Sequence, residues 1–259
     1  MSLDSILPAR LALIGGEEFA DGFDDVHAEL LAGLNGRRRV VFLPTCAADD
    51  GPEAIDYWCD LARNKLSALG ASVETPRVLD VASANDERYA QPIAEADWVY
   101  FGGGYPHVAM RILPNTRVMD ALKAARTRGA LVSGSSGGAM LMCARSFVIT
   151  PEHAAGIGQY WQSGVPDDWD PPLLPPLDGL GWIPRSVCAP HFNRRLLPKK
   201  WLAGEGLPDG FTLIGIDEQT ALVSRGDQGW GVRGRGAVTI VRKGLEPVIY
   251  QTGEQVVLS

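Results

Sequence analysis

A serine lies at the centre of a G-x-S-x-G pentapeptide at residues 134–138. The apolar run 130–133 precedes this pentapeptide, and a helix-like segment, 139–144, follows it. A strand, a tight glycine-flanked turn and a helix form a nucleophile elbow, whose bend holds the serine in a strained, exposed position. The helix N-terminus would direct free N–H groups and its positive dipole end at an oxyanion beside Ser136. The pattern predicts a nucleophilic serine, and a glycine-rich turn in which serine only caps the helix is the alternative.

The chain has only four histidines from which a base could come. A nucleophilic serine needs a base within hydrogen-bond reach and a carboxylate that orients this base. His191 is the preferred base because it ends the strand-like run 186–190. His107 follows a glycine run at another strand end and could line the site. We expect His27 on the surface of the first helix and His153 on the excursion that follows the elbow helix.

Two sets of carboxylates compete for the orienting role. Glu218 follows the strand-like run 212–216, and an acid at a strand end is held more rigidly than one in a proline-rich segment, so Glu218 is preferred. Its neighbour Asp217 would then face the opposite way. The alternative is the Ser-acid-His chain order of α/β-hydrolases. In that order the acid would be Asp167, Asp168 or Asp170, of which we take Asp170.

A tetrahedral intermediate also needs an oxyanion hole. The triple glycine 102–104 ends the strand-like run 98–101, and backbone without side chains can bring an N–H group close to a substrate carbonyl. Gly137, directly after the serine, would supply a second N–H group. A mere strand-to-helix turn is the alternative interpretation of the triple glycine.

The elements that must position these residues alternate along the chain. Apolar runs of strand length separated by helical periodicity predict an α/β fold, with a mostly parallel central sheet and helices on both faces. Active sites of such sheets lie at the carboxyl ends of the strands. Asp49 or Asp50 is available as the N-cap of the second helix, with Pro52 in its first turn. The expected strands are 11–14, 40–43, 71–79, 98–101, 185–189, 212–216, 221–224 and 237–241, the expected helices include 53–69, 85–95 and 117–128, and 226–236 is a loop or hairpin.

Residues 151–176 break this alternation. They combine six prolines with aspartates and three large aromatic residues, and linkers seldom carry such aromatics. We interpret them as an insert that passes over the sheet edge within a single domain, 1–259. Because the insert connects the elbow helix to the strand before His191, it should border the mouth of the active site. The side chains expected at that mouth are Tyr160, Trp161, Asp167, Asp168, Trp169 and Asp170.

Length and composition exclude several classes of protein. The 259 residues, 46% hydrophobic and 21% charged, suffice for a globular core. A net charge of −7 without a basic stripe argues against nucleic acid or an anionic membrane as a partner. No apolar stretch is long enough to cross a bilayer, and residues 1–10 do not resemble a secretory signal. Four widely spaced cysteines predict reduced thiols in a cytoplasmic protein without structural zinc.

Four blocks of the chain resemble the serine peptidase family of aspartyl dipeptidase (peptidase E) and cyanophycinase, over about residues 11–241. The blocks are 13–17 (LIGGE), 101–104 (FGGG), 134–139 (GSSGGA), and 191–192 (HF) with 215–222 (GIDEQTAL). The resemblance implies a class I glutamine amidotransferase-like, flavodoxin-like sandwich. It also implies that Ser136 is the nucleophile, His191 the base and Glu218 the orienting acid. The implied oxyanion donors are Gly103 or Gly104 together with Gly137.

The chain departs from this pattern at several positions. Ala189 and Pro190 stand where cyanophycinase-like sequences tend to have Asp-Gln, and Leu197 replaces one of the arginines that those sequences carry after the His-Phe pair. Tyr105 stands where dipeptidase-like members tend to have Asn, and the insert is unusually long. The departures concern the substrate more than the catalytic residues.

We therefore expect a serine peptidase that hydrolyses small or specialised peptides through an acyl-enzyme, without cofactor or metal. Tyr105, Trp161 and Arg195 are the expected substrate-binding residues, and the guanidinium of Arg195 could pair with a substrate carboxylate. A homodimer is left open. The alternatives are an α/β-hydrolase esterase that uses Ser136, Asp170 and His191, and a non-catalytic binding module on the same fold.

Overall fold

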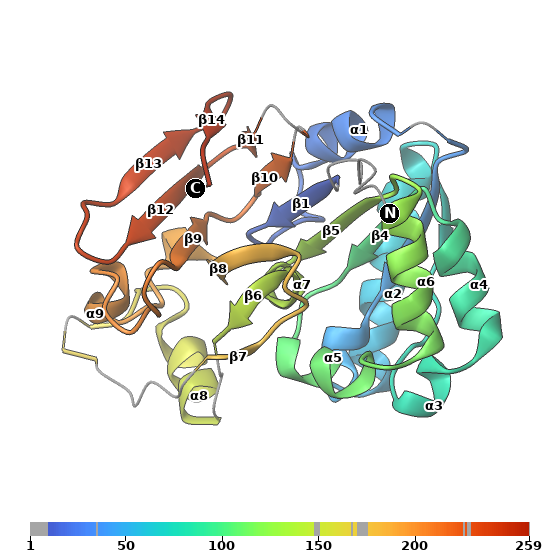
Figure 1. Cartoon of the computed structure of the whole chain (residues 1–259), viewed down its shortest axis with the longest axis horizontal. Coiled ribbons are helices and arrows are strands. Elements are labelled where there is room, and N and C mark those ends of the chain that lie inside the picture. Colours follow the sequence, from blue (N-terminus) through green and yellow to red (C-terminus); the bar gives the residue numbers. More distant parts are fainter. Residues whose placement is uncertain are drawn as a thin grey trace, which may run out of the picture.

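The computed structural model describes residues 10–34, 36–147, 151–166, 168–169, 176–224, 226 and 229–258, and it contains two β-sheets (Figure 1). The larger sheet has eight strands in the order β14-β11-β10-β1-β5-β4-β2-β3. Strands β1, β5, β4, β2 and β3 run parallel, and β10, β11 and β14 extend the sheet antiparallel. The bounds are β1 Leu11–Ile14, β2 Arg39–Leu43, β3 Ser72–Glu74, β4 Trp98–Phe101, β5 Leu131–Ser135, β10 Thr220–Ser224, β11 Trp230–Gly234 and β14 Gln255–Val256.

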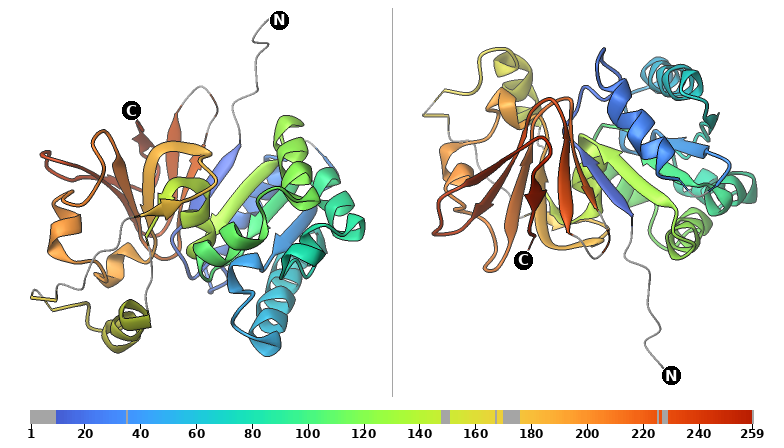
Figure 2. Two further views of the ribbon diagram at one scale, coloured as in Figure 1. Left: turned by 60° about the horizontal axis from the view of Figure 1, so that its bottom comes forward. Right: turned by 90° about the horizontal axis from the view of Figure 1, so that it is seen from above.

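Helices cover both faces of the parallel part of this sheet (Figure 2), as predicted. Alternate strand residues face opposite ways, so Leu11 and Leu13 join one core with α4, α5 and α6, whereas Ala12 and Ile14 join another with α1 and α2. The helix bounds are α1 Asp24–Ala32, α2 Pro52–Ala68, α3 Val81–Ala84, α4 Glu87–Glu95, α5 Pro106–Ile112, α6 Arg117–Thr127, α7 Gly137–Met142, α8 Pro151–Tyr160 and α9 Lys199–Leu202, with short 3-10 turns η1 Thr45–Ala47 and η2 Phe192–Arg194.

The second sheet was not anticipated from the sequence. It has six strands in the order β13-β12-β9-β8-β6-β7, of which β6, β8 and β9 run parallel. Its strands are β6 Cys143–Ser146, β7 Leu177–Asp178, β8 Ile183–Ala189, β9 Thr212–Ile216, β12 Ala237–Arg242 and β13 Val248–Gln251. The chain leaves the larger sheet after α7 and returns to it through the β9–β10 connection. The residues predicted to be catalytic, at the ends of β5, β8 and β9, are therefore brought together from two different sheets.

Several element boundaries differ from the predicted ones. The strand expected at 71–79 is confined to β3, and the helix expected at 85–95 corresponds to α4, which starts at Glu87 because the Asp86 carboxylate accepts a hydrogen bond from the Arg88 N–H. The short helix α3 before it was not predicted. Gly51, not Asp49 or Asp50, precedes α2, and no side chain caps that helix. The four cysteines are buried free thiols.

The prediction that His27 lies on the surface is wrong. The residue is fully buried, between the rings of Phe19, Phe23, Trp98 and Tyr100. Its Nε2 lies 3.4 Å from the Tyr100 hydroxyl, and burial lowers its pKa to about 3. The reason is the helical period of α1, which turns this position toward the sheet although its sequence neighbours are acidic.

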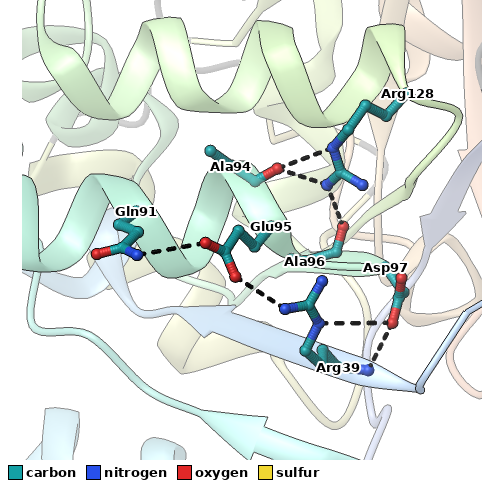
Figure 3. A network of polar contacts seen from close by, with 7 residues as sticks. All are labelled: Arg39, Gln91, Ala94, Glu95, Ala96, Asp97 and Arg128. Carbon is teal, nitrogen blue, oxygen red and sulfur yellow. Dashed lines mark hydrogen bonds and ion pairs between the residues drawn. The ribbon is translucent and has the colours of Figure 1, made fainter.

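A polar network fixes the end of the sheet opposite the strand ends that carry the glycine turns (Figure 3). At the start of β2, the Arg39 amide donates to Asp97 at 3.0 Å and its guanidinium donates to Glu95 at 2.9 Å. Arg128, after α6, donates to the Ala94 carbonyl at 3.0 Å, near the end of α4. Arg128 also donates to the carbonyl of Ala96, the C-cap of α4, so it satisfies two carbonyls at the end of this helix, and the network ties α4 to β2 and α6.

Candidate active site

Ser136 stands at the carboxyl end of β5 with φ 51° and ψ −117°, a backbone conformation that non-glycine residues rarely adopt. The turn is as tight as the G-x-S-x-G pattern predicts. A Cβ at Gly134 would overlap the carbonyl group of Gly138, and a Cβ at Gly138 would lie 2.5 Å from the carbonyl oxygen of Phe101. Only glycines fit at both positions, so the sequence itself produces the elbow.

His191 reaches Ser136 from the second sheet. It follows β8 in the left-handed conformation, with φ 52°, and its amide donates to the Gly15 carbonyl at 2.8 Å. Its Nε2 lies 3.1 Å from Ser136 Oγ. Gly16 has φ 131°, and a Cβ there would overlap the imidazole, so the backbone after β1 packs directly against the ring. The two glycines after β1 thus fix both the backbone and the ring of His191.

Glu218 lies on the other side of the imidazole, in the connection between β9 and β10. One carboxylate oxygen, Oε1, lies 2.9 Å from His191 Nδ1. The side chain is 7% exposed, and its amide donates to Asn193 Oδ1 at 2.9 Å. Asp217 is turned away, as expected, because its Oδ2 accepts from the Ala237 amide at 2.9 Å. Burial raises the pKa of Asp217.

The environment of His191 favours the neutral imidazole. Burial lowers the pKa of His191, while the hydrogen bond and charge of Glu218 raise it and Arg194 lowers it. A neutral ring that contacts a hydroxyl through Nε2 and a carboxylate through Nδ1 can accept a proton from the hydroxyl, and the carboxylate stabilises the resulting imidazolium.

Sequence reasoning missed Asn193 and Arg194. The Arg194 Nε donates to the second oxygen of Glu218 at 2.7 Å, and its guanidinium lies 5.5 Å from the Trp161 ring centroid. Their place in the sequence could have identified them, because both follow His191 within three residues, in the η2 turn, and so must lie close to its imidazole.

Three glycine amides lie near Ser136. A Cβ at Gly103 would be 3.4 Å from Ser136 Cβ, and a Cβ at Gly137 would overlap the carbonyl oxygen of Gly104. Among the described residues, none of the three amides donates to a protein acceptor. The strand end after β4 and the start of α7 therefore present unpaired N–H groups next to the serine.

A pocket of about 880 Å³ opens at these residues, and Ser136 and His191 line it. Tyr105, Trp161 and Arg195 line it too. The rings of Trp161 and His191 pack edge-on, with their centroids 4.8 Å apart. Residues of the predicted insert from Ile157 to Trp169 also contribute to the lining. Asp168 is exposed and is not among the lining residues, whereas Asp167 and Asp170 lie outside the described residues.

His107 has no described contact with Ser136. The ring of His107, in α5, lies 5.6 Å from that of Tyr105, and its Nδ1 is buried without a described partner. His153 belongs to α8. No cluster of metal-ligating side chains occurs in the described part of the chain, and none of the helices described there is long and apolar enough to cross a membrane.

A family model, Peptidase family S51, matches residues 11–230. The chain belongs to peptidase family S51. It is accordingly a serine-type peptidase, and its fold is of the class I glutamine amidotransferase-like, flavodoxin-like type that the resemblance implied. No curated protein matches the chain.

Two solved structures are similar to this S51 peptidase. A peptidase from an acI-B1 Actinobacterium is 25% identical, with 98% of each chain covered and a TM-score of 0.77. A protein assigned as a peptidase E from Listeria monocytogenes EGD-e is 17% identical, with 88% of this chain and 98% of that chain covered and a TM-score of 0.59, and it shows the fold alone.

Proposed function

We propose that this S51 peptidase hydrolyses short peptides through an acyl-enzyme formed on Ser136. The observation that carries the proposal is the chain of contacts from Ser136 Oγ to His191 Nε2 at 3.1 Å and from His191 Nδ1 to Glu218 Oε1 at 2.9 Å. The serine end of that chain opens into the pocket, and the carboxylate end is buried.

In the proposed mechanism Ser136 Oγ attacks the scissile carbonyl while its proton passes to His191 Nε2. Glu218 holds the imidazole in the required tautomer and stabilises the imidazolium. The amides of Gly137 and of Gly103 or Gly104 donate to the oxyanion. His191 then protonates the leaving amine, and the same residue activates the water that releases the acyl group.

The preference for short peptides follows from the insert. Trp161 lies over the His191 ring, and the loop that follows it lines the pocket, so the chain crosses directly beside the reacting atoms. Arg195 is exposed at the pocket, and its guanidinium has no ion-pair partner among the described residues. It is therefore suited to bind a carboxylate of the peptide.

The esterase alternative needs an aspartate of the insert at His191 Nδ1. Glu218 already occupies that nitrogen at 2.9 Å, which supports the peptidase triad over the alternative. A binding module without catalysis would need neither the strained serine nor the ordered imidazole.

The test is labelling with a fluorophosphonate, followed by mass spectrometry of the modified peptide. We expect one label, on Ser136, and its loss in Ser136→Ala. Ser136→Ala should also lower turnover of the peptides that the wild type cleaves by about 10³-fold or more. A wild-type protein that remains unlabelled and cleaves no peptide would support the binding module, and casein cleaved as fast as dipeptides would contradict the preference for short substrates.

A further inference from the structure

The pocket extends from Ser136 along an apolar surface. We define the apolar wall as the six side chains Met140, Phe147, Ile157, Phe192, Trp201 and Leu202. They come from α7, the end of β6, α8, η2 and α9, so the wall is built on elements that flank the candidate triad. It begins at the reacting residues, because Met140 follows Ser136 on α7 and Phe192 follows His191.

The wall is fixed from behind. Trp201 is 1% exposed and packs edge-on against Phe147, with ring centroids 4.3 Å apart. The Phe192 ring occupies the space beside Gly215, where an added Cβ would lie 2.6 Å from it. Trp201 also belongs to the core on the outer face of the second sheet. Because these side chains are closely packed from behind, the apolar wall is preformed and does not need to rearrange when a ligand binds.

Among the described residues that line the pocket, no arginine or lysine is buried. Arg194 is bonded to Glu218, and the Asp217 carboxylate is bonded to the Ala237 amide. Arg194 does not line the pocket, and the lining residues Asp50, Arg195 and Lys199 are exposed. A carboxylate on the apolar wall would lose its hydration without gaining a buried cation, which costs several kcal/mol by order of magnitude. Apolar side chains gain free energy in the same place.

We infer that this peptidase selects peptides with a bulky apolar residue, such as phenylalanine or leucine, next to the scissile bond, and that the apolar wall binds this side chain. The inference rests on the proposed function, since it assigns the substrate class of the same site. The charged ends of a short peptide then lie among the exposed residues of the pocket, and its apolar side chain lies on the wall.

The first experiment measures kcat/KM of the wild type for short peptides in which the residue on each side of the scissile bond is in turn Phe, Leu, Ala or Asp. At one of the two positions we expect Phe or Leu to exceed Ala by about tenfold or more, within the range that an apolar pocket gives for a few methylene groups. Asp should be the poorest residue there. A preference for Asp over Phe and Leu at both positions would overturn the inference.

The second experiment compares the same substitution at two sites. Ile157→Glu places a charge on the wall, whereas Ile249→Glu changes a residue of β13 that is 60% exposed and does not line the pocket. Ile157→Glu should lower kcat/KM for the Phe peptide by about tenfold or more and affect the Ala peptide less. Ile249→Glu should change both by no more than about twofold. An equal loss on the Phe and Ala peptides in Ile157→Glu would contradict side-chain recognition by the wall.

A binding measurement separates this inference from the proposed mechanism. Ser136→Ala retains the wall, so calorimetry with Phe and Asp peptides reports side-chain preference without hydrolysis. Tighter binding of the Phe peptide supports the inference even if no peptide is cleaved. If Ser136 is labelled by the fluorophosphonate but Asp peptides bind and react best, the proposed function stands and the apolar preference is wrong.

Discussion

Replacement of Glu218 by glutamine tests the electrostatic role of the carboxylate. The amide keeps the size of the side chain but removes the charge 2.9 Å from His191 Nδ1. It also leaves the Arg194 guanidinium, which donates to Glu218 Oε2 at 2.7 Å, without its anionic partner. The variant should therefore fold, bind peptide and fail to stabilise the imidazolium that forms when Ser136 loses its proton.

The size of the effect follows from the geometry. Two unit charges roughly 4 Å apart in a medium of effective dielectric constant about 20 interact by about 4 kcal/mol. A loss of that size in the transition state lowers kcat by roughly 10³-fold. KM should change little, because Glu218 does not line the pocket. The unpaired Arg194 cation adds to the loss, since it opposes a positive charge on the ring.

The assay is the pH dependence of kcat/KM for Glu218→Gln beside two controls. Glu218 raises the pKa of His191, whereas burial and Arg194 lower it, so removal of the carboxylate lowers that pKa further. Since His191 must be unprotonated to act as base, the acid limb of the profile should move to lower pH in Glu218→Gln. Asp217→Asn keeps an acceptor for the Ala237 amide and should leave the limb in place. Asp170→Asn tests the α/β-hydrolase alternative, in which Asp170 orients His191, and it should change activity far less than Glu218→Gln.

A Glu218→Gln variant with near-normal kcat and an unchanged acid limb would refute the reasoning. So would an equal or larger loss in Asp170→Asn, which would assign the orienting acid to the insert.

Two further predictions concern the surroundings of His191, and a third concerns the buried His27. Trp161→Ala should expose the imidazole to water and raise the pKa of His191, so the acid limb of kcat/KM should move to higher pH, and an unmoved limb would show that Trp161 does not shield the ring. Gly16→Ala should lower kcat/KM by about 10²-fold, with native near-ultraviolet circular dichroism, because the added methyl group displaces the His191 ring; near-normal activity would contradict this. Burial lowers the pKa of His27 from its ordinary 6.5 to about 3, so below pH 6.5 the unfolded chain binds a proton that the folded protein excludes. The free energy of unfolding should therefore fall by up to about 1.4 kcal/mol for each pH unit below 6.5. Urea unfolding at two pH values in that range should show a smaller pH dependence of this free energy in His27→Gln than in the wild type.

The sequence predicted those parts of the fold and site that local pattern determines. The limits of β1, β4 and β9 follow from short, mainly apolar runs between turn residues, and strand-end positions predicted that Ser136, His191 and Glu218 lie close together, as the structure has them.

Long-range pairing and unusual backbone angles were not predictable in the same way. The strand β6 looked like the end of the elbow helix, because the apolar run 139–144 continues into it and its partner β8 is distant in sequence. Arg194 was missed because both residues flanking η2, His191 and Arg195, adopt the left-handed conformation, which propensity does not predict for them. The turn that these angles produce lets the guanidinium of Arg194 reach the carboxylate of Glu218.

The backbone after β1 has a further role at the boundary of the two sheets. Gly15 accepts from the His191 amide and donates to the Thr220 carbonyl, and Gly16 accepts from the Gln219 amide, so one dipeptide joins the segments that carry the proposed base and acid. Ser136 ends a strand of the larger sheet and His191 follows a strand of the smaller one, so the proposed triad requires the two sheets to keep their relative position. We expect heat or denaturant that loosens this contact to separate Ser136 from His191. Peptidase activity would then report whether the tertiary contact between the two sheets is intact.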